Sequence, residues 1–315
     1  MKRLILMYHR VAECEEGPWP LSVTPTHFSE HLQVLQDYAV VVSLEVLQSG
    51  ECDADRQVAL TFDDGYADNW HSAWPLLQES AMPATFFIVT GCVGRNREFW
   101  WDELERLLLR TDVGMEVRID IAGRTRTWRV STKPSPWTRL SWRRADHGSL
   151  DPRQRVYHEI YQLLWPLPDA ERLAALDSLA SSLPQAPPPD SASRPMQMEE
   201  LKALAAEELA EIGSHTVTHP PLPKLPRALQ ADEIIRSKAY LEESLGTPIQ
   251  SFSYPYNRQS RTTRSLVERN GFARACGGRG KLVERGAAPF DLSRFAAKDW
   301  DANEFRLHLE EWMAA

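Results

Sequence analysis

The sequence predicts an α/β fold built around a parallel sheet or barrel, and three observations support this prediction. Short apolar runs rich in β-branched and aromatic residues alternate with segments of helical periodicity along most of the 315 residues, as in repeated βα units. Apolar residues make up 43% of the chain and charged residues 25%, which is the balance of a folded globular protein. The longest apolar runs, such as residues 85–89, are far too short to cross a bilayer, so we expect no transmembrane segment.

Eight segments are predicted as strands because each is short, apolar and followed by a turn or a helical pattern. In chain order they are residues 4–8, 40–44, 58–62, 85–89, 209–212, 250–254, 272–276 and 292–295. Four helices with an apolar stripe lie between them. We expect one to follow a cap at Thr26 and one to follow Asp68, whereas the other two end at Gly246 and Asn270, residue types that favour helix ends.

The alternation of strands and helices breaks once, between residues 95 and 197. Residues 116–130 alternate polar and apolar side chains around a central glycine, which predicts an antiparallel hairpin. Helical periodicity follows at 153–165 and 170–183, and five prolines in residues 184–195 indicate a stiff linker. We interpret residues 95–197 as an insertion within a single domain that spans residues 1–315.

The charge of the chain excludes one class of partner and suggests another. The formal net charge of −8 argues against a nucleic-acid-binding protein, which would carry an excess of positive charge. Residues 116–155 differ, with ten Lys and Arg against four Asp and Glu. This basic stretch, which includes Arg124 and Arg126, is either an ordinary solvated surface or one that selects a substrate with phosphate or carboxylate groups.

The cysteines and the first residues favour a cytoplasmic protein. The four cysteines are widely spaced and form no C-x-x-C pair, so we expect reduced thiols. The basic start is followed by only about five apolar residues and no small-residue cleavage site, which indicates a first strand rather than a secretion signal.

Two polar motifs follow predicted strands and have the composition of a metal site. Asp63 and Asp64 follow the strand predicted at 58–62, and adjacent carboxylates in a pocket need a cation beside them or a proton on one of them. His215 and His219 follow another strand, and Pro220 keeps His219 out of helical geometry, so both imidazoles lie in one turn. Two histidines and a carboxylate are a common ligand set for catalytic Zn²⁺. The alternatives are a solvated Asp-Asp-Gly turn and two unrelated surface histidines.

A third motif ends the strand predicted at 250–254, so three strand ends carry polar residues on one expected rim. The three motifs are Thr61-Phe62-Asp63-Asp64-Gly65, His215-x-x-x-His219 and Tyr254-Pro255-Tyr256. In this order, and with Met7-Tyr8-His9-Arg10-Val11 before them, they resemble the polysaccharide deacetylase family, also called the NodB-homology family or carbohydrate esterase family 4. The resemblance covers residues 1–95 and 197–300. It implies an irregular (β/α) barrel, to which residues 95–197 add a mixed, mainly helical insertion.

The resemblance also implies a metal-dependent hydrolase that acts on linear amide C–N bonds and removes N-acetyl groups from amino sugars. It assigns Asp64, His215 and His219 as ligands of one divalent ion, with Zn²⁺ expected and Co²⁺ or Ni²⁺ as alternatives. It makes Asp63 the general base, and it uses the backbone N–H of Tyr256 to hold the oxyanion.

Substrate contacts are expected from four residues. By resemblance, Pro255 and Tyr256 belong to the substrate side of the site, and Trp300 lines the pocket for the acetyl methyl group. Trp101 starts the insertion, where its ring is a candidate for stacking on a sugar. For both tryptophans the alternative is ordinary packing in the core.

The sequence departs from the family pattern in two places. Ser253 stands where the family carries an arginine that steadies the catalytic aspartate, and Ala296 replaces an aspartate of a later motif. Joint loss of both charges suggests a subfamily variant that lacks this ion pair. The family's catalytic acid is a late histidine, but His308 lies in a predicted surface helix. His9, at the end of the first strand, is the better candidate, unless it only orients a neighbour.

The sequence therefore predicts an N-deacetylase whose substrate is a polysaccharide, an oligosaccharide or a glycan precursor, and the basic stretch raises the question of an anionic one. Two alternatives remain: a metal-dependent amidase that acts on a small non-sugar amide, and a catalytically silent carbohydrate-binding relative.

Overall fold

The computed structural model describes residues 1–13, 18–110, 115–121, 123–130, 152–183 and 186–314. They form two compact units, which we call the barrel unit and the helical unit. The barrel unit consists of Met1–Cys14, Leu21–Arg95 and Pro195–Ala315. The helical unit covers residues 96–194, close to the predicted insertion, and adds the segment around Trp19. Among the described helices, none is long and apolar enough to span a membrane.

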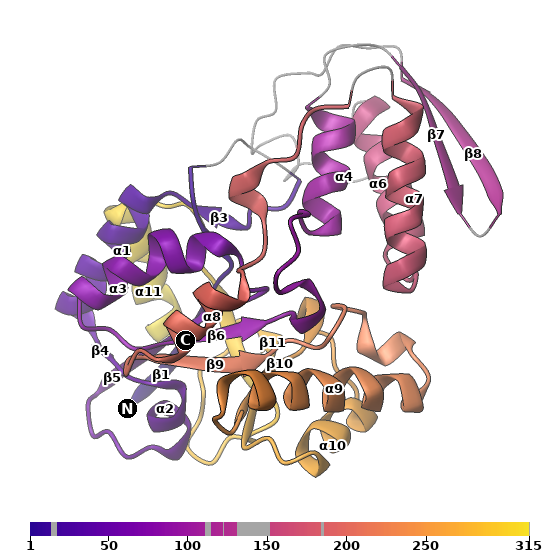
Figure 1. Ribbon diagram of the computed structural model, residues 1–315. Helices are drawn as coiled ribbons and strands as arrows, with labels where there is room; N and C mark the ends of the chain where they lie inside the picture. The colour runs from indigo at the N-terminus through magenta and orange to yellow at the C-terminus, as the bar shows by residue number, and fades with distance from the viewer. Residues whose placement is uncertain (14–17, 111–114, 122, 131–151, 184–185, 315) are drawn as a thin grey trace. The chain divides into compact units, whose positions relative to one another are not determined.

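Within the described residues, parallel strands close the predicted barrel (Figure 1). Its members are β1 (Lys2–Tyr8), β5 (Arg56–Phe62), β6 (Ala84–Ile88), β9 (Ala210–Ser214), β10 (Ser251–Ser253), β11 (Arg274–Arg279) and β12 (Leu292–Ala296). The order is β1-β12-β11-β10-β9-β6-β5, and β5 pairs back with β1 along its whole length. Closure removes the exposed edges that an open sheet would leave.

The segment predicted as a strand at 40–44 is only partly a strand. Val40–Val41 (β4) pairs with the start of β5, but Leu44–Ser49 forms helix α2. Ser43 caps this helix by accepting a hydrogen bond from the Val46 N–H at 3.2 Å, and Gly50 ends it with a φ of 77°. These two caps override the apolar pattern of the segment.

The predicted helices of the barrel unit are present, with two corrections. They are α1 (Pro25–Tyr38), α3 (Trp74–Glu79), α9 (Arg227–Leu245), α10 (Arg261–Arg269) and α11 (Ala302–Ala314). Helix α8 (Met198–Ala205), like α2, was not predicted. As predicted, α9 and α10 end at Gly246 and Asn270. Thr24 rather than Thr26 caps α1, because its hydroxyl accepts from the His27 N–H and Pro25 starts the helix. After Asp68, a π-helical turn at Asn69–Ala73 (η1) precedes α3.

Short elements complete this unit. Two-residue strands β2 (Arg10–Val11) and β3 (Ser22–Val23) pair outside the barrel. The 3-10 turns are η2 (Thr90–Cys92), η4 (Leu222–Lys224) and η5 (Pro255–Asn257), and a further one, η3 (Ser191–Ser193), lies in the helical unit.

Apolar residues fill both faces of the barrel strands. Along β1, Ile5 packs inside the barrel with Ala59 and Phe87, whereas Leu4 and Leu6 belong to the core outside it. Strands buried on both faces have the nearly continuous apolar sequences from which they were predicted.

The two ends of the helical unit leave and re-enter the barrel unit at one place. The Gly94 N–H donates to the Met196 carbonyl at 3.0 Å, and the Met196 N–H donates to the Gly65 carbonyl at 3.0 Å. Gly65 directly follows Asp64, so the return of the chain is tied to the loop that carries this aspartate.

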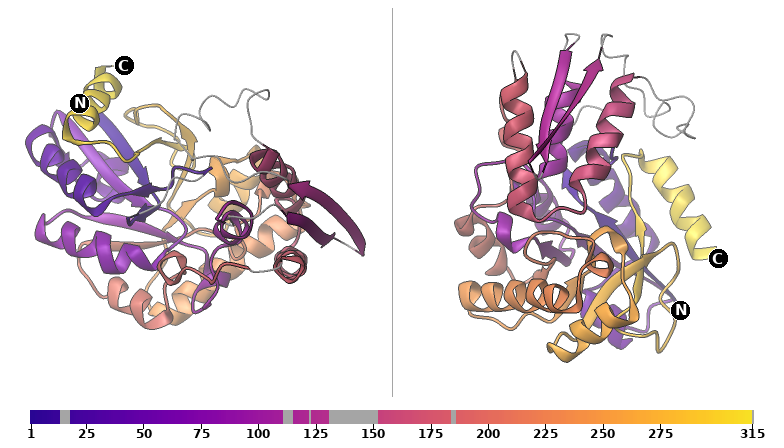
Figure 2. Two further views of the ribbon diagram at one scale, coloured as in Figure 1. Left: turned by 90° about the horizontal axis from the view of Figure 1, so that it is seen from above. Right: turned by 90° about the vertical axis from the view of Figure 1, so that its right-hand side faces the viewer.

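The helical unit contains the predicted hairpin and helices. Strands β7 (Met115–Ile121) and β8 (Arg124–Val130) pair antiparallel, and α4 (Trp100–Leu109) contacts both α6 (Pro152–Leu164) and α7 (Asp169–Ser182) (Figure 2). Trp19 joins the unit through a 2.8 Å hydrogen bond from its indole N–H to the Tyr157 hydroxyl. Of the predicted linker, residues 184–185 lie outside the described residues; further along, the Asp190 N–H donates to Glu98 at 3.1 Å.

Candidate active site

The predicted site residues follow the carboxyl ends of several barrel strands. Asp63 and Asp64 follow β5, His215 follows β9, and His9 follows β1. Because all these strands are parallel, their carboxyl ends meet at one rim of the barrel, which is where barrel folds place their functional groups.

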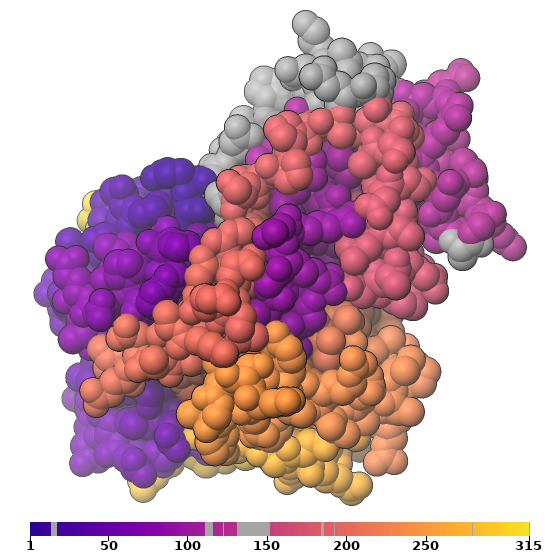
Figure 3. Space-filling view, viewed as in Figure 1, coloured from indigo at the N-terminus to yellow at the C-terminus, as the bar shows by residue number. Residues whose placement is uncertain are grey.

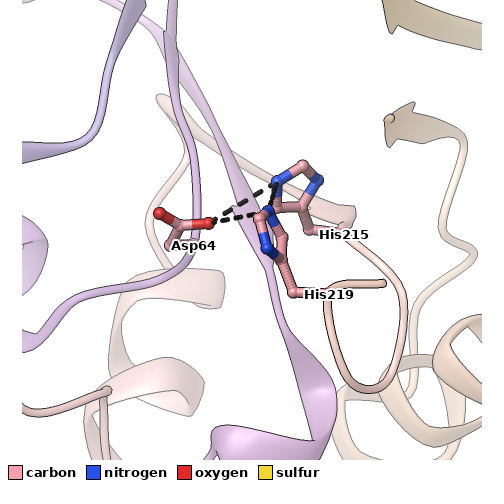
Figure 4. A group of neighbouring side chains, drawn as sticks. All are labelled: Asp64, His215 and His219. Atoms are coloured by element: carbon pink, nitrogen blue, oxygen red, sulfur yellow. Dashed lines mark hydrogen bonds and ion pairs between the residues drawn. The ribbon is translucent and has the colours of Figure 1, made fainter. Parts of the chain in front are cut away.

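Asp64, His215 and His219 form a compact, buried triangle (Figure 4). Asp64 Oδ1 lies 3.6 Å from His215 Nε2 and 3.4 Å from His219 Nε2, and the two Nε2 atoms are 3.1 Å apart. Ligand atoms about 2 Å from a tetrahedral ion lie about 3.3 Å from one another. The three atoms therefore fit a divalent ion such as Zn²⁺.

The protonation of His215 suits a metal ligand. Its Nδ1–H donates to the Ser253 carbonyl at 2.7 Å, which leaves Nε2 with a lone pair toward Asp64 and His219. Burial lowers the pKa of His215, with Asp63 opposing this effect, so the neutral imidazole is favoured.

The backbone that carries the three residues is unusual. Asp64, Thr216 and His219 have φ values of 73°, 69° and 55°, in the left-handed region. For such residues this conformation costs roughly 1–2 kcal/mol each. The His219 N–H donates to Thr216 Oγ1 at 3.0 Å, which helps to hold the turn between the two histidines. Strain of this kind is typical of functional sites.

Asp63 lies beside the triangle and is held by Arg294 from β12. Two hydrogen bonds of 2.7 Å join the Arg294 guanidinium to the two oxygens of Asp63, and both side chains are buried, at 0% and 4% exposed. The guanidinium also donates to Ser253 Oγ at 2.9 Å and to Asn257 Oδ1 at 3.1 Å. Burial alone would raise the pKa of Asp63, but Arg294 and His215 outweigh it and hold this pKa well below its usual range.

Arg294 corrects the prediction that the chain lacks this ion pair. Ser253 stands at the position predicted for the family's arginine, but Arg294 from β12 pairs with Asp63, and Ser253 is one of its hydrogen-bond acceptors. The sequence held a signal for it. Arg294 is two residues from Leu292, which faces the barrel interior, and an arginine on an interior face needs a buried carboxylate.

His9 lies near this ion pair, whereas His308 belongs to a different layer. Burial lowers the pKa of His9 to about 4, Asp63 raises it, and Arg294 and His215 lower it. Asn69 fixes the backbone here by donating from its amide to the His9 carbonyl at 2.8 Å. His308 is on α11, with its ring 4.0 Å from the ring of Trp300.

The predicted substrate residues lie in three settings. Tyr256 is next to the triangle: its ring centroid is 4.5 Å from that of His219, and its φ of 59° is left-handed. Pro255 is buried at the start of the same turn. Trp300 is 9% exposed and packs on α11, and Trp101 is 5% exposed and stacks on Phe99 in the helical unit. These are the contacts of core tryptophans, and a substrate role for either stays a prediction.

Comparisons with known proteins bear on the family and the fold of the chain. The family model described as polysaccharide deacetylase matches residues 50–118 and 189–275. YxkH of Bacillus subtilis (strain 168), which carries the name of a polysaccharide deacetylase, is 29% identical over 108 residues. That alignment covers 33% of this chain and only 37% of YxkH.

Two solved structures share the fold over nearly the whole chain. IcaB from Ammonifex degensii matches with a TM-score of 0.61 and 19% identity, covering 100% of this chain and 97% of that one. The Streptococcus pyogenes deacetylase PplD in complex with acetate matches with a TM-score of 0.59 and 17% identity, covering 99% and 98%. At these identities the likeness shows a common fold.

Proposed function

The chain belongs to the polysaccharide deacetylase family, and from this premise we propose that it is a metal-dependent hydrolase that removes N-acetyl groups from amino sugars. The substrate would be a polysaccharide, an oligosaccharide or a glycan precursor. One observation carries the proposal: three ligand atoms converge beside a second carboxylate, Asp63, that is held ionised outside the ligand set.

Asp64, His215 and His219 would hold one divalent ion, with Zn²⁺ the first choice and Co²⁺ or Ni²⁺ as alternatives. When bound, such an ion polarises the amide carbonyl and makes the attacking water more acidic.

Side chains and one backbone N–H then carry out the proton transfers and stabilise the developing negative charge. Asp63 takes a proton from the attacking water, and Arg294 keeps the Asp63 carboxylate ionised and oriented for this step. The backbone N–H of Tyr256 donates to the oxygen on which negative charge develops. Because burial lowers the pKa of His9 to about 4, its ring starts neutral, and it passes to the leaving amine nitrogen the proton that Asp63 has taken up.

The direct test is an acetate-release screen over N-acetylated glycans, with Zn²⁺, Co²⁺ and Ni²⁺ added in turn to metal-free protein. We expect release from at least one glycan with one of these ions, and none from the Asp63→Asn variant. Release from a small non-sugar N-acetyl amide alone would replace the proposal with the amidase alternative. Glycan binding without release under any condition would favour the silent carbohydrate-binding alternative.

Metal content tests the ligand assignment separately. His215→Ala removes one corner of the triangle and is expected to lose most of the bound ion. Retention of one ion per chain in this variant would contradict the assignment.

We further propose that the hairpin of the helical unit selects an anionic substrate. Arg118 and Arg129 both lie within ion-pair distance of Glu116. Arg124 and Arg126 are exposed, and within the described part of the chain they have no ion-pair partner. Figure 3 shows the hairpin at the surface. Both are suited to bidentate contact with phosphate or carboxylate groups. Residues 131–151 of the basic stretch lie outside the described residues.

The predicted cytoplasmic location stays a prediction, which cell fractionation tests.

A further inference from the structure

One carboxylate from helix α9 holds the turn that carries both histidines. Glu233 Oε2 accepts hydrogen bonds from the backbone N–H groups of Val217, at 2.8 Å, and Thr218, at 2.9 Å. Its other oxygen accepts from the Thr218 hydroxyl at 2.6 Å. Three hydrogen bonds therefore end on one side chain, all from the residues between His215 and His219.

The turn needs such an acceptor because its backbone is not helical. Thr216 and His219 are both left-handed, so the N–H groups between them point away from the acceptors that a helix would supply. The opposite side of the turn is tied to η2, where the Thr90 N–H donates to the Thr216 carbonyl at 3.0 Å and the Gly91 N–H donates to the Val217 carbonyl at 2.8 Å. Glu233 supplies the matching ties on the α9 side.

The same face of α9 also holds the residue before His215. Ser237 lies one helical turn after Glu233, and its hydroxyl is 2.7 Å from that of Ser214. Both side chains are buried. Helix α9 therefore fixes the chain on both sides of His215, through Ser237 before it and through Glu233 after it.

We propose that Glu233 is a positioning residue for the metal ligands, which it serves by holding the His215–His219 turn in its left-handed form. This inference rests on the metal site of the proposed function and deepens it. Removal of the Glu233 carboxylate lets the turn relax, which moves the Nε2 atoms of His215 and His219 away from the separation that one ion requires.

The test compares three variants by their Zn²⁺ dissociation constants, measured by competition with a chelator. Glu233→Leu removes all three hydrogen bonds and is expected to weaken Zn²⁺ binding by about tenfold, as loss of groups that orient metal ligands does. Glu233→Gln keeps an oxygen for the two backbone N–H groups and is expected to stay within about threefold of the wild type. Glu243→Leu, an exposed position on the same helix, is the matched control and is expected to leave Zn²⁺ affinity unchanged.

The unfolding temperature of the metal-free variants separates positioning from general stability. If Glu233→Leu binds Zn²⁺ as tightly as Glu243→Leu, the inference is overturned. Should Glu233→Leu not fold, Thr218→Val removes a single hydrogen bond to Glu233 and is expected to weaken Zn²⁺ binding by a few fold, and unchanged affinity again overturns the inference.

Failure of the proposed function gives a different result. Wild-type protein that binds Zn²⁺ but releases no acetate contradicts the deacetylase, while the order of the three dissociation constants still supports the role of Glu233. Wild-type protein that binds no Zn²⁺, Co²⁺ or Ni²⁺ overturns both.

Discussion

The two ends of the barrel contain polar clusters of the same composition, each with an arginine, a carboxylate, a serine from β10 and a threonine. The rim cluster consists of Arg294, Asp63, Ser253 and Thr61, and the base cluster of Arg274, Glu211, Ser251 and Thr85. At the rim the guanidinium grips one carboxylate with two 2.7 Å bonds. At the base it is divided between Glu211, at 3.1 Å, and Glu45, at 3.0 Å.

The surroundings of the clusters differ more than their composition. Asp63 is 4% exposed, whereas Glu211 is 27% exposed at the other end of the strands. Both clusters have a second carboxylate nearby, but among the described residues only the rim cluster also adjoins a pair of histidines, which the loop after β9 supplies. Both ends of this barrel thus contain a buried arginine paired with a carboxylate, and the loops that follow the strands supply the groups that distinguish the rim.

The largest expected difference between the ends is in turnover. Asp63→Asn removes the proton acceptor and is expected to lower kcat by about 10²- to 10⁴-fold with the metal retained. Glu211→Gln is a matched change at the base and is expected to leave kcat within about twofold, because it lies far from the chemistry. Steady-state acetate release and metal analysis check both variants. Loss of the ion from Asp63→Asn would mean that Asp63 and Asp64 have the opposite roles.

The next difference is in stability and its pH dependence. Arg294→Met leaves the buried Asp63 without its guanidinium partner and is expected to cost about 3–5 kcal/mol of unfolding free energy near neutral pH. Because Arg294 depresses the pKa of Asp63 in the folded protein, its stabilising effect is present above the unfolded pKa of about 3.9 and is lost as pH falls through the folded value.

Without Arg294, the pKa of Asp63 rises, so the acidic limb of kcat/KM is expected to move to higher pH. Arg274→Met at the base is the control, with a smaller loss of stability and an unchanged pH profile. Denaturant unfolding and pH-rate profiles measure these effects, and an unshifted acidic limb in Arg294→Met would contradict the role given to Arg294.

A smaller effect distinguishes the rim from the outer helical layer. His9→Ala is expected to lower kcat by about 10²-fold if His9 supplies the proton to the leaving amine. His308→Ala, on α11, is expected to change kcat by less than about twofold. Parallel kcat measurements give the ranking, and the reverse order would restore the family's usual late histidine as the acid.

The smallest effect is expected where arginines are exposed rather than buried. Replacing Arg124 and Arg126 by glutamate is expected to raise KM by a few fold without lowering kcat. Added salt is also expected to raise the wild-type KM, because it screens contacts between exposed charges, with a Debye length of about 8 Å near physiological ionic strength. Reversal of Arg118, which already contacts Glu116, is the control. A KM that neither salt nor these changes affect would make the hairpin an ordinary solvated surface.

Sequence reasoning found the parts of the site that are local. Asp63 and Asp64 are adjacent, and His215 and His219 lie within one turn, so two short motifs after apolar strands indicated two histidines and a carboxylate. The resemblance to the polysaccharide deacetylase family then singled out Asp64 as the carboxylate of the set. The role of Arg294 was not predicted because its partner, Asp63, is 231 positions away. No residue near β12 in the sequence indicates which carboxylate Arg294 contacts.

Most of the fold could also be predicted from local patterns, and one strand prediction was wrong in part. Strands that are buried on both faces have continuous apolar sequences, which makes them recognisable. Each predicted strand overlaps a strand of the eight-stranded sheet. Residues 40–44 are the exception, because only Val40–Val41 is a strand. The caps at Ser43 and Gly50 favour a helix over residues 44–49 despite the apolar pattern.

The paired hydrogen bonds of Met196 have a consequence for how such a chain can be re-engineered or can diverge. Because the Gly94 N–H is hydrogen-bonded to the Met196 carbonyl, the segment between them is a loop with adjacent ends. Doubling the length of a flexible loop adds only about 0.6 kcal/mol to the entropic cost of closing it. Inserts of different size are therefore exchangeable at this junction with little penalty to the barrel. A replacement segment must keep the hydrogen bond from the Met196 N–H to the Gly65 carbonyl, because Gly65 is one residue from Asp64, the proposed metal ligand.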